Sequence, residues 1–280
     1  MKPIIVDSLI YKYPGSDHLA LNDISFEVEE GEIIGIIGKN GSGKTSLSLA
    51  LTGLIPHFFG GGYGGCVLID GLEVRHSTVT EISERVGYVF DNPFTQMTAA
   101  KNTVYEEVAF GLENLGLDKV EMKRRVDWSL NLLDLEDVKD KYPFALSGGQ
   151  MQRVAIAGII AMRPKILVLD EPTSQLDPEG TEEVFQVIQD LAGEGITILI
   201  VEHKLEKIAR FCEKIILLHE GKLIDFNKPQ RVFSRSDLVE YGIKPPVVTR
   251  VARSLGIQNP KTGYYPVTIE EMLQLVKRDE

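Results

Sequence analysis

Three short, mainly apolar runs form the clearest pattern along the chain: Ile33–Ile37, Ile166–Leu169 and Ile196–Val201. Runs of this length and composition are typical of strands buried on both faces of a parallel sheet. A helical stretch, Thr45–Thr52, follows the first run, and another, Pro178–Ala192, separates the second run from the third. This alternation predicts an α/β fold, with a mostly parallel sheet covered by helices.

The N-terminal part of the chain has a different pattern. Pro3–Val6 and Ile24–Val28 are strand-like segments on either side of the turn-rich stretch Tyr13–Asp17, which favours an antiparallel pair. Further strands are expected at Val67–Ile69 and Val86–Phe90. We therefore predict an N-terminal antiparallel β subdomain beside the parallel sheet.

Composition shifts along the chain predict its domain organisation. A mostly helical section from about Thr103 to Leu135 lies between the predicted strands, so we expect a helical subdomain at about residues 92–162. It would be inserted into a nucleotide-binding domain of residues 1–226. Residues 227–280, with proline- and glycine-containing breaks, predict a small α-rich accessory segment. The glycine-rich stretch Phe58–Gly65 is expected to be a flexible surface loop.

Composition excludes several classes of protein. The 280 residues suffice for one large domain and an appendage, and the apolar runs are far too short to cross a bilayer. Cys66 and Cys212 are too few for a disulfide framework or a zinc site, which favours structural thiols in a reducing cytosol. The net charge of −11 disfavours a nucleic-acid-binding surface. We expect a soluble cytosolic protein that does not bind nucleic acid.

The segment Gly38–Thr45 fits the pattern G-x-x-x-x-G-K-T in full, with a strand before it and a helix after it. In such a loop, successive backbone N–H groups surround a phosphate, Lys44 reaches the β- and γ-oxygens, and the Thr45 hydroxyl is a ligand for Mg²⁺. The context required of a phosphate-binding loop is therefore complete.

Two adjacent carboxylates, Asp170 and Glu171, follow a buried strand at the edge where α/β sheets bind ligands. Asp170 suits the coordination shell of Mg²⁺, and Glu171 can polarise the water that attacks a γ-phosphate. His203 follows the next buried strand and can lie near the same phosphate. By itself, the acidic pair would more often indicate the start of a helix, and the histidine a helix start or a surface residue.

Leu146–Gln150, with the sequence LSGGQ, predicts a helix that begins after Ser147 as N-cap and buries Met151, Val154, Ala155, Gly158, Ile159 and Met162. A helix N-terminus is a favourable place for an anion. The chain already has a phosphate loop, so this helix N-terminus would be a second anion site. A second site suggests that the LSGGQ segment serves the nucleotide of another subunit. Tyr13 could stack on adenine or simply end a strand.

These elements, in this order, resemble the ATP-binding-cassette ATPases over residues 1 to about 235. The resemblance implies ATP and Mg²⁺ as cofactors and ATP hydrolysis by a head-to-tail dimer, in which Lys44, Glu171 and His203 are catalytic. It implies ATP contacts within one subunit at Tyr13, Gly38, Asn40, Gly41, Ser42, Gly43, Lys44, Thr45 and Ser46. It implies contacts with the partner's ATP at Ser147, Gly148, Gly149 and Gln150, communication across the dimer through Asp177, and Mg²⁺ ligands at Thr45, Asp91 and Asp170.

Softer motifs narrow the resemblance to the ATPase subunits of energy-coupling-factor transporters, including the cobalt- and nickel-type importers. They are Tyr88–Pro93, Glu107–Asn114, Gly53–His57, Thr173–Pro178 and Glu202–Glu206. The segments 245–250 and 267–271 are similar to that group's C-terminal dimerisation segment. The implied partners are a second ATPase subunit, identical or different, a transmembrane coupling subunit and a substrate-binding membrane subunit, with the chain peripheral on the cytoplasmic face of the membrane.

The resemblance has one departure, at Asp91, where the family has glutamine after the strand. A carboxylate can still bind Mg²⁺ but cannot donate a hydrogen bond. We expect hydrolysis to survive, slowed or differently coupled, and Gln96 is not expected to replace the missing amide. The expected function is energising the import of a vitamin or transition-metal ion. The alternatives are a cassette of another importer class and, less favoured, a non-transport cassette protein.

Overall fold

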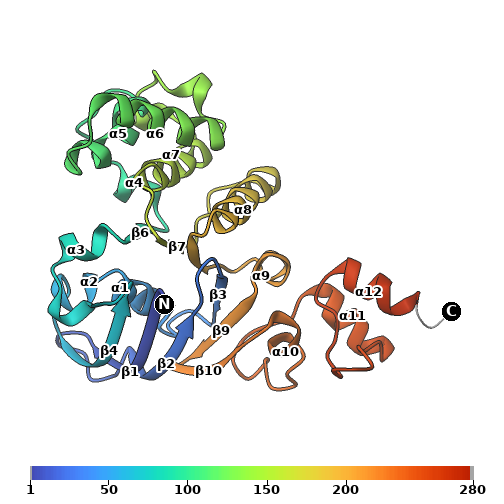
Figure 1. The fold of residues 1–280 in the computed structure, drawn as a ribbon. Helices are drawn as coiled ribbons and strands as arrows, with labels where there is room; N and C mark the ends of the chain where they lie inside the picture. Colours follow the sequence, from blue (N-terminus) through green and yellow to red (C-terminus); the bar gives the residue numbers. More distant parts are fainter. Residues whose placement is uncertain (1, 278–280) are drawn as a thin grey trace.

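The computed structural model describes residues 2–277, which form two sheets, a helical lobe and a C-terminal extension (Figure 1). The larger sheet has six strands in the order β10-β9-β3-β8-β7-β6, and all neighbours from β9 to β6 are parallel. Its strands are β3 (Ile33–Ile37), β6 (Val86–Val89), β7 (Ile166–Asp170), β8 (Thr197–Val201), β9 (Lys214–His219) and β10 (Lys222–Asn227). The predicted α/β fold with a mostly parallel sheet is confirmed.

The register of the central strands determines which residues share the carboxyl edge of the sheet. β8 lies between β3 and β7, where Val201 pairs with Ile36 on one side and with Asp170 on the other. The segments that follow the three strands therefore leave the sheet side by side. These are the phosphate loop after β3, Glu171 after β7 and His203 after β8.

The second sheet is antiparallel, with the order β2-β1-β4-β5, and it forms the predicted N-terminal subdomain. Its strands are β1 (Ile4–Lys12), β2 (Leu21–Val28), β4 (Gly62–Ile69) and β5 (Leu72–Glu73). The prediction of a surface loop over Phe58–Gly65 is wrong for its second half, because Gly62–Gly65 open β4 and Gly62–Gly64 pair with β1. Gly65 has a φ of +82°, and a Cβ there would lie 2.2 Å from the carbonyl oxygen of Ser8. Glycine thus marks a β-bulge rather than a flexible loop.

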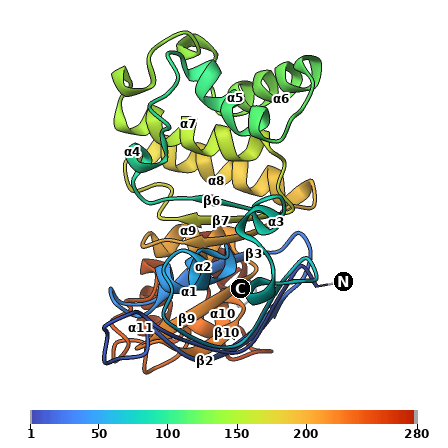
Figure 2. The same cartoon turned by 90° about the vertical axis from the view of Figure 1, so that its left-hand side faces the viewer.

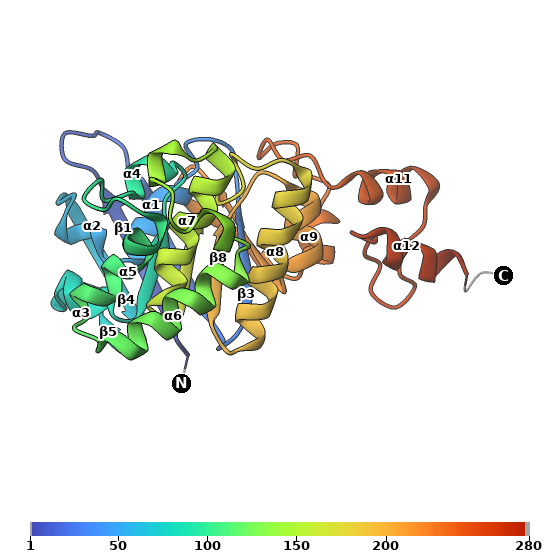
Figure 3. The same ribbon diagram turned by 90° about the horizontal axis from the view of Figure 1, so that it is seen from above.

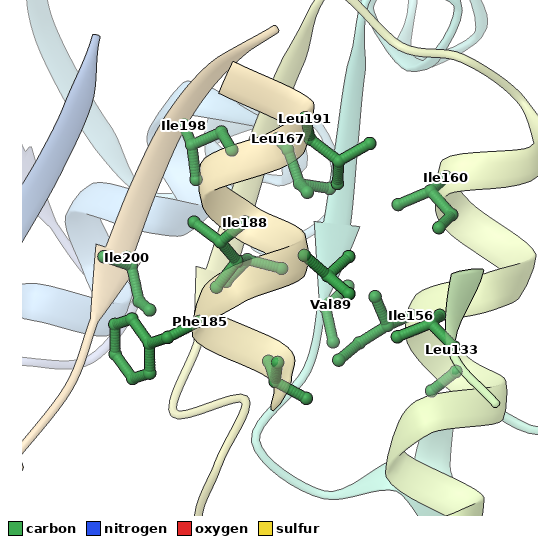
Figure 4. Packing of buried hydrophobic residues seen from close by; sticks show 14 of the residues in the cluster. Val89, Leu133, Ile156, Ile160, Leu167, Phe185, Ile188, Leu191, Ile198 and Ile200 are labelled. Atoms are coloured by element: carbon green, nitrogen blue, oxygen red, sulfur yellow. The ribbon is translucent and has the colours of Figure 1, made fainter. Parts of the chain in front are cut away.

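Two hydrophobic cores lie on opposite faces of the six-stranded sheet. One core joins its strands to the antiparallel sheet and to α1 (Lys44–Leu51). The other lies under α7 (Gly148–Ala161), α8 (Pro178–Gly193) and α9 (Leu205–Phe211). Figure 4 shows Phe185 and Ile188 of α8 packed among side chains of the sheet and α7. Both side chains are almost completely buried, so truncating Phe185 to alanine would cost about 3–5 kcal/mol.

The helices between β6 and β7 form a separate lobe above the sheet (Figures 1 and 2). They are α4 (Pro93–Gln96), α5 (Val104–Asn114), α6 (Lys119–Leu132) and α7. The predicted buried face of α7 is only partly right, because Ile159 and Met162 are half-buried while Ile156 and Ile160 are fully enclosed. The lobe and the sheet both cover α7, which therefore has no single buried stripe. The smaller helices α2 (Leu54–His57) and α3 (Val79–Ser83) precede β6.

The chain ends in a short hairpin and an α-rich segment. Sequence reasoning missed the hairpin of β9 and β10, which closes one edge of the sheet. The helices α10 (Pro229–Phe233), α11 (Val247–Leu255) and α12 (Ile269–Val276) follow, and Figure 3 shows that α11 and α12 project away from the rest of the molecule. The boundary at residues 226 and 227 stays a prediction. Within residues 2–277 no helix is long and apolar enough to span a membrane.

Candidate functional site

The loop from Gly38 to Gly43 connects the end of β3 to the start of α1. Gly43 has a φ of +104°, and a Cβ there would lie 2.7 Å from the carbonyl oxygen of Ala20. A Cβ on Gly38 would lie 2.4 Å from the Ser42 hydroxyl oxygen. Glycine is thus required at both positions, and the loop leads directly into the N-terminus of α1. Free N–H groups at a helix N-terminus favour an anion such as phosphate.

Lys44 is held at the mouth of this loop. Its side chain is only 7% exposed, and its Nζ donates to the carbonyl oxygens of Gly38 at 3.0 Å and Lys39 at 3.4 Å. Burial lowers the pKa of Lys44, and the nearby carboxylates of Glu171 and Asp170 oppose this effect. The ammonium group therefore has the position from which it can turn toward a bound phosphate.

Asp170 is a buried carboxylate at the end of β7, and it accepts a hydrogen bond from the Tyr88 hydroxyl at 3.1 Å. Burial raises its pKa, while hydrogen bonds from Thr45 and Tyr88 act in the opposite direction. The Thr45 hydroxyl and the Asp170 carboxylate thus present oxygen ligands side by side, the donor type that Mg²⁺ prefers. Residues 2–277 contain no cluster of three or more His, Cys, Asp or Glu side chains suited to a metal, so an ion here would need further oxygens from a phosphate.

Glu171 and His203 meet directly, with His203 Nε2 at 2.9 Å from Glu171 Oε1. Both residues follow adjacent strands, and the Glu171 N–H donates to the carbonyl oxygen of Val201 at 2.9 Å. Glu171 has a φ of +51°, an uncommon backbone conformation for a residue with a side chain. The structure thus brings the acid and the histidine together at the carboxyl edge of the sheet, beside the phosphate loop.

Tyr13 lies next to the start of α1. Its hydroxyl is 3.1 Å from the Ser46 hydroxyl, and its ring makes edge contacts with the rings of Tyr11 and Phe59. The side chain is therefore close to the phosphate loop, where a base contact is feasible. Its role as a contact for adenine stays a prediction.

Asp91 and Gln96 occupy the loop after β6. The Asp91 carboxylate is close enough to Asp170 to raise that residue's pKa, although burial is the larger cause. Asp91 is thus near the expected Mg²⁺ position. Gln96 is occupied elsewhere, because its Oε1 accepts from the Phe90 N–H at 3.0 Å and its Nε2 donates to the Tyr88 carbonyl oxygen at 3.0 Å. It closes the end of β6, and the expectation that it does not replace the missing glutamine stays a prediction.

The LSGGQ segment lies at the start of α7, in the helical lobe. Ser147 is the N-cap, and its hydroxyl and the Gln150 side chain form a reciprocal capping box. A cavity of about 510 Å³ is lined by Ser147–Gln150 and by the segment from Gln175 to Asp177. The Asp177 carboxylate accepts from the Gly180 N–H at 2.8 Å and caps α8. None of the phosphate-loop residues lines this cavity.

Sequence reasoning missed one group beside the site. Glu202 is only 4% exposed, and its carboxylate accepts hydrogen bonds from the Thr173 hydroxyl and from the His203 N–H at 2.7 Å. The available signal was a carboxylate directly between a buried strand and a candidate catalytic histidine. Because burial cannot be deduced from that spacing alone, the residue was not singled out.

Comparisons with known protein families agree with this geometry. Residues 21–174, more than half of the chain, match the family model described as ABC transporter. A putative ABC transporter ATP-binding protein of Pyrococcus abyssi is 44% identical over 257 residues, which cover 91% of each chain. An energy-coupling factor transporter ATP-binding protein, EcfA1 of Streptococcus thermophilus, is 42% identical over 255 residues, which cover 90% of each chain.

Solved structures give the same result. The structure of cbiO1 from Clostridium perfringens, described as part of the ABC transporter complex cbiONQ, superimposes with a TM-score of 0.75 at 32% identity. The match covers 91% of this chain and 99% of that protein. A dimeric ATP-binding cassette in a post-hydrolysis state with ADP and Pi has a TM-score of 0.71 at 28% identity and covers 80% of this chain.

Proposed function

This chain belongs to the ABC transporter family of ATPases, and we propose that it is the ATPase subunit of an energy-coupling-factor importer. The observation that carries the proposal is the 42% identity to an energy-coupling factor ATP-binding protein over 90% of both chains. Such an alignment extends beyond the matched cassette core of residues 21–174. The similarity to cbiO1, over 91% of this chain, supports the same class.

We assign ATP hydrolysis to the residues at the carboxyl edge of the sheet. Glu171 acts as the general base for the attacking water, and the contact of 2.9 Å with His203 holds both side chains toward the γ-phosphate. Lys44 leaves its backbone carbonyl partners to contact the β- and γ-oxygens. Mg²⁺, held by Thr45 and Asp170 with Asp91 nearby, would neutralise charge on these phosphates.

The second half of each ATP site comes from a partner subunit in a head-to-tail dimer. The cavity lined by the LSGGQ segment is separate from the cavity beside the phosphate loop. This separation supports the arrangement, because within one chain neither cavity is closed by the other half of an ATP site. Ser147, Gly148, Gly149 and Gln150 would receive the partner's γ-phosphate at the N-terminus of α7. Asp177, beside them in the same cavity, would transmit the state of one site to the other.

The C-terminal helices offer a surface for the same association. On α11, Val251 and Leu255 are exposed by 42% and 63%, and on α12, Ile269 and Leu273 are exposed by 62% and 52%. Both pairs have helical i, i+4 spacing, so each forms an apolar stripe. We assign these stripes to contacts with a second ATPase subunit, which is identical in the simplest case.

The helical lobe carries the expected contact with a transmembrane coupling subunit. Phe94 and Tyr142 are exposed by 56% and 47%, and both rings lie near the ring of Phe144. This exposed aromatic group suits an apolar segment of a partner. The chain would thus sit peripherally on the cytoplasmic face of the membrane. A separate membrane subunit would select the vitamin or transition-metal ion.

Co-purification tests the proposal. The tagged chain, purified in mild detergent from its own cells, should bring down a hydrophobic scaffold protein and a small substrate-binding membrane protein. Phe94→Ser combined with Tyr142→Ser should release them, while Val120→Ser, at an exposed position of α6, should not. Stable association with ribosomes or DNA in place of membrane proteins would contradict a transporter. Association with an importer that uses an extracytoplasmic binding protein would indicate another importer class.

A further inference from the structure

Glu202 is a buried carboxylate to which the catalytic assignment gives no role. It lies directly after β8 with only 4% of its surface exposed. The carboxylate accepts from the Thr173 hydroxyl, from the His203 N–H at 2.7 Å and from the Lys204 N–H at 3.3 Å. A carboxylate is costly to bury unless hydrogen bonds satisfy it, and those it makes are stronger than neutral ones.

The partners of Glu202 belong to two different loops. His203 and Lys204 follow β8, whereas Thr173 follows β7, two residues after Glu171. Thr173 is itself completely buried. Lys204 reinforces the connection, because its Nζ donates to the Thr173 carbonyl oxygen at 3.0 Å and to the Thr181 hydroxyl on α8 at 2.7 Å. The two loops are thus joined by contacts in both directions.

We propose that Glu202 is a positioning residue that locks the loop after β7 to the loop after β8. The lock keeps Glu171 Oε1 and His203 Nε2 within 2.9 Å of one another, in the arrangement needed for hydrolysis. Glu171 needs such support because its φ of +51° is uncommon and tends to relax without restraint. Glu202 itself reaches the edge of the cavity lined by Gly38–Asn40 and His203, and it acts on the reaction through its neighbours. The inference rests on the proposed catalytic roles of Glu171 and His203.

The first test separates turnover from nucleotide binding. Glu202→Gln keeps the size of the side chain but removes its charge, so the contacts with the Thr173 hydroxyl and the His203 N–H become weaker neutral hydrogen bonds. Because small displacements of reacting groups slow catalysis, kcat for ATP should fall roughly 10- to 100-fold, with KM and the affinity for a fluorescent ATP analogue changed less than about twofold. Thr173→Val removes the hydroxyl that donates to Glu202, so it should likewise lower kcat with little change in nucleotide affinity. Thr173→Ser keeps a hydroxyl and should retain most of kcat.

Glu213→Gln is the matched control. The Glu213 carboxylate also accepts a backbone hydrogen bond, from the Ile33 N–H at 2.6 Å, but at the opposite edge of the sheet. This variant should keep kcat within about twofold, because no catalytic group is displaced. If Glu202→Gln loses nucleotide affinity together with kcat, or if Thr173→Val and Thr173→Ser are equally impaired, Glu202 is merely structural and the proposal is overturned.

The second test asks whether Glu202 acts through His203. In single-turnover assays on a His203→Ala background, Glu202→Gln should reduce the rate by less than about twofold, because the contact that it aligns is already gone. If Glu202→Gln reduced the rate by the full 10- to 100-fold on that background as well, the proposed role of Glu202 would be overturned. The proposed function has its own outcome: if Glu171→Gln and His203→Ala leave hydrolysis intact, the catalytic assignment fails. If those two variants slow hydrolysis strongly while Glu202→Gln has no effect, only the lock fails.

Discussion

Two faces of this chain differ in how far their functional groups are already assembled. The phosphate-loop face comprises the phosphate loop and the carboxyl edge of the sheet, and the LSGGQ face comprises Ser147–Gln150 and the cavity that they line. On the first, groups from three neighbouring strand ends are already in contact, as the 2.9 Å approach of His203 to Glu171 and the 3.1 Å hydrogen bond from Tyr88 to Asp170 show. On the second, Ser147–Gln150 line an open cavity about 510 Å³ in volume, and the side chains of Ser147 and Gln150 are engaged in the capping of α7 itself.

The difference has a physical origin. The first face depends on a six-stranded sheet whose register cannot slip without exposing its core, so its groups are pre-positioned. The second face belongs to the helical lobe, which is joined to the sheet through the segments before α4 and after α7 (Figure 1). Variants of the first face should therefore change chemistry within one subunit. Variants of the second should change only what two subunits do together.

The largest effect is expected on the first face. Glu171→Gln removes the general base but leaves the phosphate loop intact, so kcat should fall by roughly 10²- to 10⁴-fold while ATP affinity is retained. Steady-state phosphate release and equilibrium binding of a fluorescent nucleotide measure the two quantities. Glu194→Gln, an exposed acid near the end of α8, is the control and should behave like the unmodified chain.

On the second face, Gly149→Asp should abolish cooperation between subunits without affecting binding to one subunit. A Cβ at Gly149 would lie 3.0 Å from Leu176 Cδ2, and the new carboxylate would face the partner's phosphates. Repulsion between like charges costs several kcal/mol, so turnover should fall about 100-fold or more, with monomer nucleotide affinity within about twofold.

Gly158→Asp is the control for that comparison. It places the same side chain in the same helix, at a position with no neighbour within 4 Å. Light scattering with and without ATP, on a Glu171→Gln background, should show dimers for the control and monomers for Gly149→Asp. Loss of nucleotide binding by the Gly149→Asp monomer would contradict the division between the two faces.

Asp91→Gln should have a smaller effect, because it alters a charge near the metal rather than a reacting group. Removing this carboxylate takes a negative charge away from Asp170, which should weaken the apparent affinity for Mg²⁺ a few-fold. The maximal rate should change less than about threefold. Titrating Mg²⁺ at constant ATP measures both, with Asp137→Asn on the exposed surface of the helical lobe as control. Identical titration curves would make Asp91 a neutral departure from the family pattern.

The smallest expected change separates the capping of α7 from its role in the dimer. Ser147→Ala and Thr103→Ala each remove an N-cap that forms a capping box, at α7 and α5 respectively. Each should cost about 1 kcal/mol of unfolding free energy in urea titrations, because each orphans helix N–H groups. Only Ser147→Ala should also reduce turnover. Equal turnover in both variants would show that Ser147 serves α7 alone.

Local sequence patterns predicted several strands and most of the candidate site residues. The runs Ile33–Ile37 and Ile166–Leu169 predicted two buried strands to within one residue, because a strand enclosed on both faces needs apolar side chains at every position. The phosphate loop, Asp170–Glu171 and the LSGGQ helix start were likewise predictable, since each depends on chemistry within a few neighbouring residues.

Other features could not be deduced from local patterns. Gly62–Gly65 have almost no side chains to indicate a strand, and only pairing with β1 makes them one. The hairpin of β9 and β10 likewise depends on the neighbour that β3 provides for β9. The burial of Glu202 results from the approach of two loops that are 29 residues apart in sequence at the Thr173 contact.

The amino-acid sequence by itself determined which residues can bind phosphate, hold Mg²⁺ and activate water, because those abilities belong to residue types at short spacings. The tertiary structure alone decided that β8 lies between β3 and β7, which brings His203 to Glu171 and both to the phosphate loop. Strand order depends on the combined packing of two cores along the whole chain, and no local periodicity encodes it.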